Sequence, residues 1–140
     1  MSDLEILITY GFEKAGEWRL LKGKIDPDLS PELAKKKNVV YAFVVADEVK
    51  YIGICHAERT KLEDRMRTQR TNKCMPCLIK KEINEGKKVK IFALKPGEVE
   101  YHGLKVNLVR SIEPRLIEIF NNPEWNIKTA KWRREQKPSS

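Results

Sequence analysis

The chain has 140 residues, 41% of them hydrophobic, so it is most simply one domain with a core of its own. It carries 28 Lys and Arg against 20 Asp and Glu, a net charge of +8, which favours a polyanionic partner such as nucleic acid. No apolar stretch is long enough to cross a membrane and the N-terminus has acids where a signal peptide has lysines, so we expect a cytoplasmic protein.

The N-terminal part predicts a strand pair followed by an irregular connection. Residues 5–10 and 17–24 have the composition of two strands separated by a turn. The prolines within 25–37 favour an irregular connection, with one helical turn that begins at Ser30. Residues 1–37 are therefore expected to form an N-terminal hairpin and a connection that precede the core.

Two tyrosine-containing strings, ten residues apart, are the most informative feature of the sequence. The string VVY ends with Tyr41 inside an apolar run, and the string YIG runs from Tyr51 to Gly53. The polar residues 46–48 between them predict a turn. The two strings therefore predict a β-hairpin that holds the two tyrosines on neighbouring strands.

The remaining predicted elements are two helices, a strand, a short hairpin, a third helix and a basic tail that is loose at its end. Pro114 lies within the third of these helices and predicts a kink or a fresh helix start. Together with the N-terminal part, these elements predict an α+β fold. The elements span residues 59–70, 76–85, 87–94, 96–106, 107–121 and 128–140, in this order.

In their order along the chain, these motifs resemble the GIY-YIG nuclease family. Besides VVY and YIG, the sequence has the spacing LxxR that ends at Arg65, a helix that carries Glu113, and the string PEWN that ends at Asn126. The matching region, 38–127, is expected to be the nuclease core, with 128–140 as a basic tail. VVY departs from GIY at a position where a strand interior tolerates valine. The length and the ending are most similar to the small phage endonuclease II branch or to compact restriction enzymes.

The resemblance implies a fold and an activity. The fold would be α+β, with a small antiparallel three-stranded central sheet flanked by helices and with the N-terminal hairpin as an extension. The activity would be that of a divalent-metal-dependent endonuclease, which hydrolyses phosphodiester bonds in duplex DNA with one Mg²⁺ or Mn²⁺ per active site. Such an enzyme would act in the cytoplasm of a bacterium, an archaeon or a phage-infected host cell.

The resemblance also implies roles for individual residues. Tyr41 would be the general base for the attacking water, Tyr51 would position the water or the phosphate, Arg65 would bind the phosphate, and Glu113 would be the sole protein ligand of the metal. A free tyrosine has a pKa near ~10, so Tyr41 needs a nearby cation to act as a base. Mg²⁺ keeps most of its waters, so one carboxylate suffices. The supporting residues would be Gly53, His56, Gln69 and Asn126.

Several alternatives remain open at this stage. The segment after the second string is longer than is common in the family, so Arg59 and Arg67 are alternatives to Arg65. The alternative function is a non-catalytic nucleic-acid-binding domain on the same fold. Because one such site cuts one strand, a double-strand cut predicts a homo-oligomer, dimer or tetramer, or else sequential nicks. The basic residues expected to contact DNA are Lys14, Arg59, Arg67, Arg70, Lys73 and Lys80.

Cys74 and Cys77 form a CxxC motif, which is the ligand spacing of half a zinc site. Cys55 and His56 are the candidates for the other half. The structural alternative is that Cys77 faces the core of its helix and that the three cysteines stay reduced in the cytosol. The sequence leaves both readings open.

Overall fold

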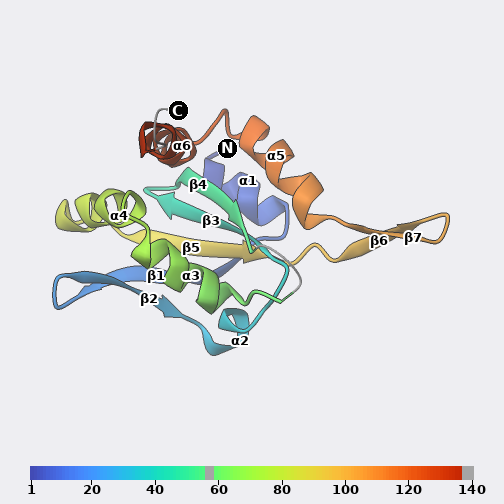
Figure 1. Cartoon of the computed structure of the whole chain (residues 1–140), viewed down its shortest axis with the longest axis horizontal. Coiled ribbons are helices and arrows are strands. Elements are labelled where there is room, and N and C mark those ends of the chain that lie inside the picture. The colour runs from blue at the N-terminus through green and yellow to red at the C-terminus, as the bar shows by residue number, and fades with distance from the viewer. Residues whose placement is uncertain (56–58, 137–140) are drawn as a thin grey trace.

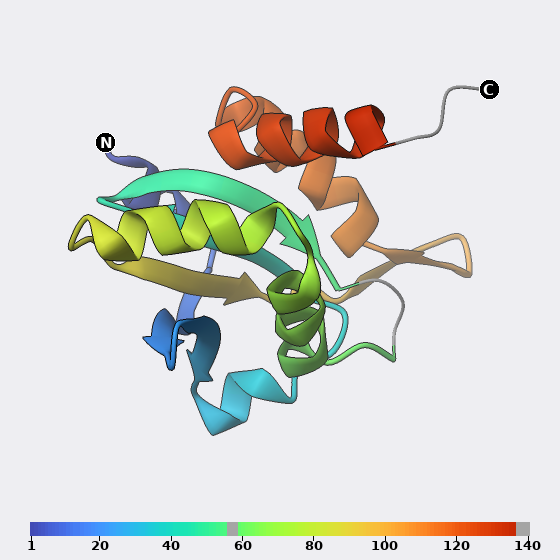
Figure 2. The ribbon, with the colours of Figure 1, turned by 60° about the vertical axis from the view of Figure 1, so that its left-hand side comes forward.

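The computed structural model describes residues 1–55 and 59–136. Its main strands are β1 (Glu13–Leu21), β2 (Lys24–Leu29), β3 (Val40–Val45), β4 (Glu48–Ile54) and β5 (Val89–Leu94). They form one antiparallel sheet in the order β2-β1-β5-β3-β4, with helices on both faces (Figures 1 and 2). The helices are α1 (Asp3–Thr9), α2 (Pro31–Ala34), α3 (Leu62–Thr71), α4 (Met75–Asn84), α5 (Val109–Ile119) and α6 (Glu124–Gln136); β6 (Glu98–Tyr101) and β7 (Leu104–Asn107) form a separate hairpin.

The prediction of a three-stranded central sheet is wrong, because the N-terminal hairpin is part of the sheet and not an extension outside it. β1 pairs with β5 on one side and with β2 on the other, which makes the sheet five-stranded. Trp18 and Ile25, from β1 and β2, are buried in the same apolar cluster as Tyr41. Burial of each such side chain stabilises the fold by about 2 kcal/mol, which favours the hairpin on the sheet over the hairpin in solvent.

The N-terminal segment that was expected to begin the strand pair, 5–10, belongs to α1 instead. Ser2 and Glu5 form a capping box, in which the Glu5 N–H donates to Ser2 Oγ at 3.2 Å and the Ser2 N–H donates to Glu5 Oε2 at 3.3 Å. Leu4 and Leu7, one face of this helix, pack against the sheet. The strand hairpin itself exists, but it lies further along the chain, in β1 and β2.

The hairpin expected from the two tyrosine strings is confirmed. β3 and β4 pair antiparallel and hold Tyr41, on β3, opposite Gly53, on β4. Tyr51 lies on β4 as well, two residues before Gly53. The turn residues Ala46 and Asp47 have positive φ angles of 48° and 64°. Two consecutive residues with positive φ are what a tight turn with the twist of a β-hairpin requires.

The C-terminal half agrees with the predicted elements except at its end. α4, α5 and the β6–β7 hairpin lie where the sequence places them, and Pro114 lies inside α5. The basic segment 128–140, expected to be a tail that follows the core and is loose at its end, is part of α6 up to Gln136. Its last residues, 137–140, lie outside the described residues. Trp125 and Thr129, one helical turn apart, are each only 2% exposed, so their burial holds this helix against the sheet.

Two apolar clusters cover the two faces of the sheet. Side chains of β3 alternate between them, so Tyr41 and Phe43 join the cluster under α3 and α4, while Val40 and Ala42 join the cluster under α1 and α5. β4 is an edge strand of the sheet, and α6 runs beside it (Figures 1 and 2). The edge strand that carries YIG is therefore in contact with three helices, α1, α5 and α6. No helix in residues 1–55 and 59–136 is long and apolar enough to span a membrane.

Candidate active site

A cleft of about 550 Å³ opens where β4 meets α3, α5 and α6. Its wall includes Tyr51 and Gly53 from β4, Arg65 from α3 and Glu113 from α5. Three of the four residues expected to be catalytic therefore reach one cavity, although α3 and α5 lie on opposite faces of the sheet. The other wall residues are Ile52, Ile54, Ile117, Asn122, Asn126, Ile127, Ala130, Arg133 and Arg134.

The fourth residue, Tyr41, lies behind this wall. Its ring is fully buried, and its hydroxyl oxygen accepts hydrogen bonds from Gln69 Nε2 at 2.6 Å and from Arg65 Nε at 3.2 Å. The centroids of the Tyr41 and Tyr51 rings are 6.1 Å apart. Arg65 lines the cleft and touches the phenol behind it, so this one side chain connects Tyr41 to the cavity.

The surroundings of Tyr41 act on its phenol in opposite directions. Burial raises the pKa of Tyr41 above its usual value, and the nearby Tyr51 raises it further. The charge of Arg65 and the hydrogen bonds from Gln69 and Arg65 lower the pKa, because they stabilise the phenolate. The net direction is upward, so a phenolate at this position at neutral pH needs a further positive charge in the cleft.

Gly53 lies against both tyrosine rings. A Cβ atom on residue 53 would lie 2.5 Å from Tyr41 Cζ and 2.9 Å from Tyr51 Cε2. These distances are too short for any side chain. Glycine is therefore required here for space, and it lets both rings pack against one stretch of β4.

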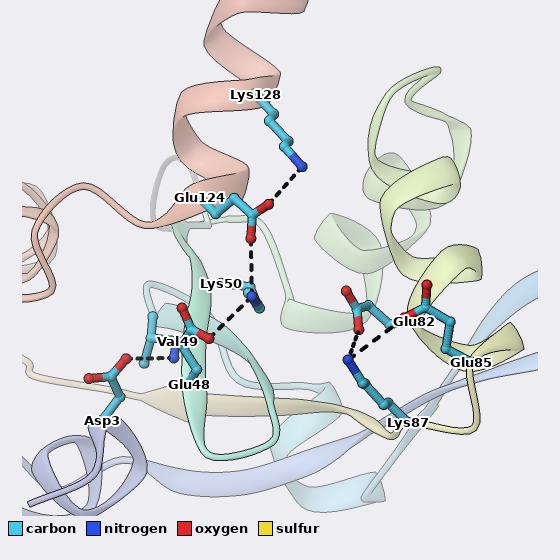
Figure 3. Close-up of polar contacts among 9 residues, drawn as sticks. All are labelled: Asp3, Glu48, Val49, Lys50, Glu82, Glu85, Lys87, Glu124 and Lys128. Atoms are coloured by element: carbon cyan, nitrogen blue, oxygen red, sulfur yellow. Dashed lines mark hydrogen bonds and ion pairs between the residues drawn. The ribbon is translucent and has the colours of Figure 1, made fainter.

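Asn126 joins α6 to β4. Its side-chain oxygen accepts a hydrogen bond from the Ile52 N–H, and its side-chain nitrogen donates to the Ile52 carbonyl, both at 2.9 Å. Beside it, Glu124 binds Lys128 at 2.7 Å and Lys50 at 3.0 Å (Figure 3). These two lysines lower the pKa of Glu124 to about 2. The contacts hold the start of α6 against Ile52, the residue between Tyr51 and Gly53.

The donor set suits a hard divalent cation that needs few protein ligands. Glu113 is the one carboxylate among the described wall residues. The chain, as far as it is described, has no group of three or more His, Cys, Asp or Glu that could hold a metal on its own. Mg²⁺ keeps several waters and binds through one or two carboxylates plus substrate oxygens, so Glu113 fits such an ion.

The CxxC motif does not form a metal centre with the cysteines that the structure describes. Cys55 is buried, Cys74 is half-buried at the start of α4, and Cys77 is exposed, so Cys77 does not face the core as the structural alternative expected. His56, the remaining candidate ligand and also an expected supporting residue of the active site, lies outside the described residues. The described residues thus offer no closed zinc site.

Most of the basic residues expected to contact DNA lie away from the cleft. Arg59 lines a neighbouring pocket of about 390 Å³ together with Arg110, and Arg65 is the arginine that reaches the cleft from α3. From the sequence, the basic segment that contains Trp132, Arg133 and Arg134 was expected either to track a nucleic-acid backbone or to be a surface tail. The structure places Arg133 and Arg134 in the wall of the cleft. Lys14, Arg67, Arg70, Lys73 and Lys80 are not in the wall, and three of them form ion pairs: Lys14–Glu17 at 2.8 Å, Arg67–Asp64 at 3.2 Å and Arg70–Asp26 at 3.6 Å.

Comparison with known proteins assigns this chain to a family. Endonuclease II of Enterobacteria phage T4 is 30% identical to it over 138 residues, which cover 91% of this chain and 98% of the phage protein. The chain belongs to the endonuclease II family. Because the match covers 91% of the chain, the likeness to endonuclease II extends beyond the segment 38–127 on which the motifs lie.

Solved structures agree with membership of the endonuclease II family. A mutant of bacteriophage T4 EndoII matches with a TM-score of 0.73 and 27% identity, over 90% of this chain and 99% of that one. A restriction endonuclease in complex with product DNA matches with a TM-score of 0.53 and 15% identity, over 86% and 82% of the two chains, and shares the fold. No protein-family model matches the chain.

Proposed function

We propose that the protein is a DNA endonuclease of the GIY-YIG type, which hydrolyses phosphodiester bonds in duplex DNA with one divalent metal ion per site. The observation that carries this proposal is the single cleft shared by Tyr51, Arg65 and Glu113, with Tyr41 hydrogen-bonded to Arg65. The net charge of +8 and the membership of the endonuclease II family support it. A restriction or a phage-type role is compatible with this chemistry.

Arg65 would bind the scissile phosphate. Its Nε is engaged by Tyr41, and a guanidinium has four further N–H donors that suit phosphate oxygens. Its permanent charge would stabilise the negative charge that develops as the phosphodiester is attacked. The hydrogen bond from Arg65 Nε to the Tyr41 oxygen would keep this guanidinium beside the phenol.

Tyr41 would act as the general base and Tyr51 would orient the water or the phosphate. The Tyr41 oxygen accepts two hydrogen bonds, an arrangement that favours the phenolate. Tyr51 lines the cleft and can reach the substrate directly. In this scheme Gln69 would hold the Tyr41 oxygen in place.

Glu113 would hold the metal ion, Mg²⁺ or Mn²⁺. When bound, the ion would supply Lewis-acid stabilisation of charge on the phosphate oxygens and the extra positive charge that a phenolate requires. Glu113 and Arg65 line the same cavity, so an ion held by Glu113 would lie in the cleft that contains the phosphate-binding guanidinium.

We also propose that the protein forms a homo-oligomer through the β6–β7 hairpin. The register pairs Val99 with Val106 and Tyr101 with Leu104, so these four side chains share one face of the hairpin. They are 37% to 66% exposed, and the hairpin projects from the body of the molecule (Figure 1). Because two isolated strands are only marginally stable in water, a second copy packed on this apolar face would stabilise the hairpin. An oligomer would bring two sites to one duplex.

The test of the proposed function is cleavage of supercoiled plasmid by the wild type and by Glu113→Gln. With Mg²⁺ the wild type should give nicked or linear DNA, and with EDTA it should give none. Glu113→Gln should bind the plasmid without cutting it. DNA binding with no cleavage by the wild type in Mg²⁺ or Mn²⁺ would favour the alternative, a non-catalytic nucleic-acid-binding domain. Wild-type protein that neither binds nor cuts would contradict both.

A further inference from the structure

The cleft wall contains two cations that the proposed chemistry does not use. Arg133 and Arg134, from α6, line the same cavity as Arg65 and Glu113. Arg65 is assigned to the scissile phosphate and Glu113 to the metal ion. The two α6 arginines therefore add two positive charges to the cleft that the proposed chemistry leaves without a role.

These two charges are available to a ligand. In the described part of the chain, no carboxylate forms an ion pair with Arg133 or Arg134. Lys128, on the same helix, differs from them because Glu124 binds it at 2.7 Å. The charge of α6 that is left unpaired thus lies at the cleft.

Contacts at the start of α6 determine that the arginines face the cleft. Asn126 pairs with both backbone groups of Ile52, and Trp125 and Thr129 are buried. The wall residues of α6 begin with Asn126 and its neighbour Ile127 and then recur every three or four residues, which keeps them on one helical face. These wall residues are Asn126, Ile127, Ala130, Arg133 and Arg134.

We propose that Arg133 and Arg134 bind backbone phosphates next to the scissile one, one phosphate each, and so hold the substrate strand in the cleft. This inference rests on the proposed function and names the groups that bind its substrate. A guanidinium binds phosphate through paired hydrogen bonds as well as through charge. Both arginines would act on DNA affinity, and neither would take part in bond cleavage.

The experiment compares Arg133→Ala, Arg134→Ala and the double variant with Lys131→Ala. Lys131 is a matched control, because it is an exposed cation on the same helix that does not line the cleft. Duplex DNA binding is measured in EDTA over a range of salt concentrations, and cleavage kinetics are measured in Mg²⁺. Arg133→Lys and Arg134→Lys test whether charge alone suffices, and circular dichroism verifies that each variant is folded.

Each alanine variant should weaken DNA binding about 5-fold to 10-fold more than Lys131→Ala does. Each lost phosphate contact should flatten the slope of log K against log salt by about 0.9, so the double variant should lose about 1.8. In cleavage, KM should rise while kcat stays within about threefold of the wild type, as expected for loss of binding that is equal in the ground state and the transition state. The lysine variants should recover part of the affinity.

Affinity and salt slope no different from those of Lys131→Ala would overturn the inference while leaving the proposed function intact. A fall in kcat at unchanged KM would also overturn it, because it would assign the arginines to the chemical step. If the double variant does not fold, the single and lysine variants decide. Wild-type protein that neither binds nor cuts DNA is a separate outcome, which removes the proposed function itself.

Discussion

Tyr41 and Gly53 face each other across β3 and β4, and the tyrosine hydroxyl lies only 2.6 Å from where a Cβ on residue 53 would be. Gly53→Ala should therefore push the ring away from Arg65 and Gln69. We expect a loss of about 1–3 kcal/mol in the free energy of unfolding, measured in urea, together with slower plasmid cleavage. Unchanged stability and unchanged cleavage would show that the two strands can separate without cost.

The hydrogen bond between Gln69 and Tyr41 can be measured with a double-mutant cycle. Tyr41→Phe leaves the buried Gln69 amide without this acceptor, which should lower the free energy of unfolding by about 1–3 kcal/mol. Gln69→Leu should also destabilise the protein, and the double variant should lose less than the sum of the two single losses. Strictly additive losses in urea unfolding would contradict a direct coupling.

Alkaline pH should destabilise the protein partly through Tyr41. Burial raises the pKa of Tyr41 in the folded state above the value near 10 of the unfolded chain. The folded state therefore holds its proton where the unfolded state has lost it, so this contribution is complete below pH 10 and falls as the pH rises further. Urea unfolding between pH 8 and 11 should show a steeper decline for the wild type than for Tyr41→Phe. Burial also raises the pKa of Cys55, to about 11, and this effect is common to both proteins.

The Glu124 contacts predict a loss of stability in acid. Hydrogen bonds from Lys128 and Lys50 lower the pKa of Glu124 to about 2, against 4.5 for the unfolded chain. The stabilisation is therefore present above pH 4.5 and is lost as the pH falls through 2. Because the group is partly exposed, we expect Glu124→Gln to cost only about 0.5 kcal/mol at pH 6. The two proteins should converge near pH 2 in thermal unfolding, and a gap that persists there would contradict the assignment.

The apolar face of the β6–β7 hairpin should control the oligomeric state. Tyr101→Ser combined with Leu104→Ser removes its two most exposed side chains, both 66% exposed, and should shift sedimentation towards the monomer. The control is Leu21→Ser, because Leu21 is 48% exposed at the end of β1, away from the hairpin. An equal effect of the control, or a wild-type protein that is monomeric at all concentrations, would contradict self-association through this face.

Sequence reasoning located the features that depend on local order. The two tyrosine strings lie ten residues apart on one hairpin, and the spacing from Leu62 to Arg65 lies within one helix, so both could be predicted directly from the sequence. The helix α1 was missed because apolar residues follow one another in 6–8, which hides the helical period.

The sheet and the α6 wall depend on contacts between distant parts of the chain. The residues near β1 in the sequence do not indicate that it pairs with β5. That pairing depends on β5 having an edge that β3 does not occupy, and β5 lies far along the chain. Likewise, Arg133 lies at the cleft because α6 is held against the sheet by contacts such as that of Asn126 with Ile52, which lies 74 residues earlier. A charged segment at such a distance has the same composition whether it is a free tail or a wall of the site.

The cleft lies around the rim of the sheet, where Arg65 comes from one layer of helices and Glu113 from the other. The distance between the Arg65 and Glu113 side chains therefore depends on how the helices on one face of the sheet are positioned relative to those on the other face. A shift of about 1 Å between layers leaves most backbone hydrogen bonds intact but is enough to disturb a reacting geometry. On mild heating, DNA cleavage should therefore be lost at a temperature at which circular dichroism still shows the native content of helices and strands.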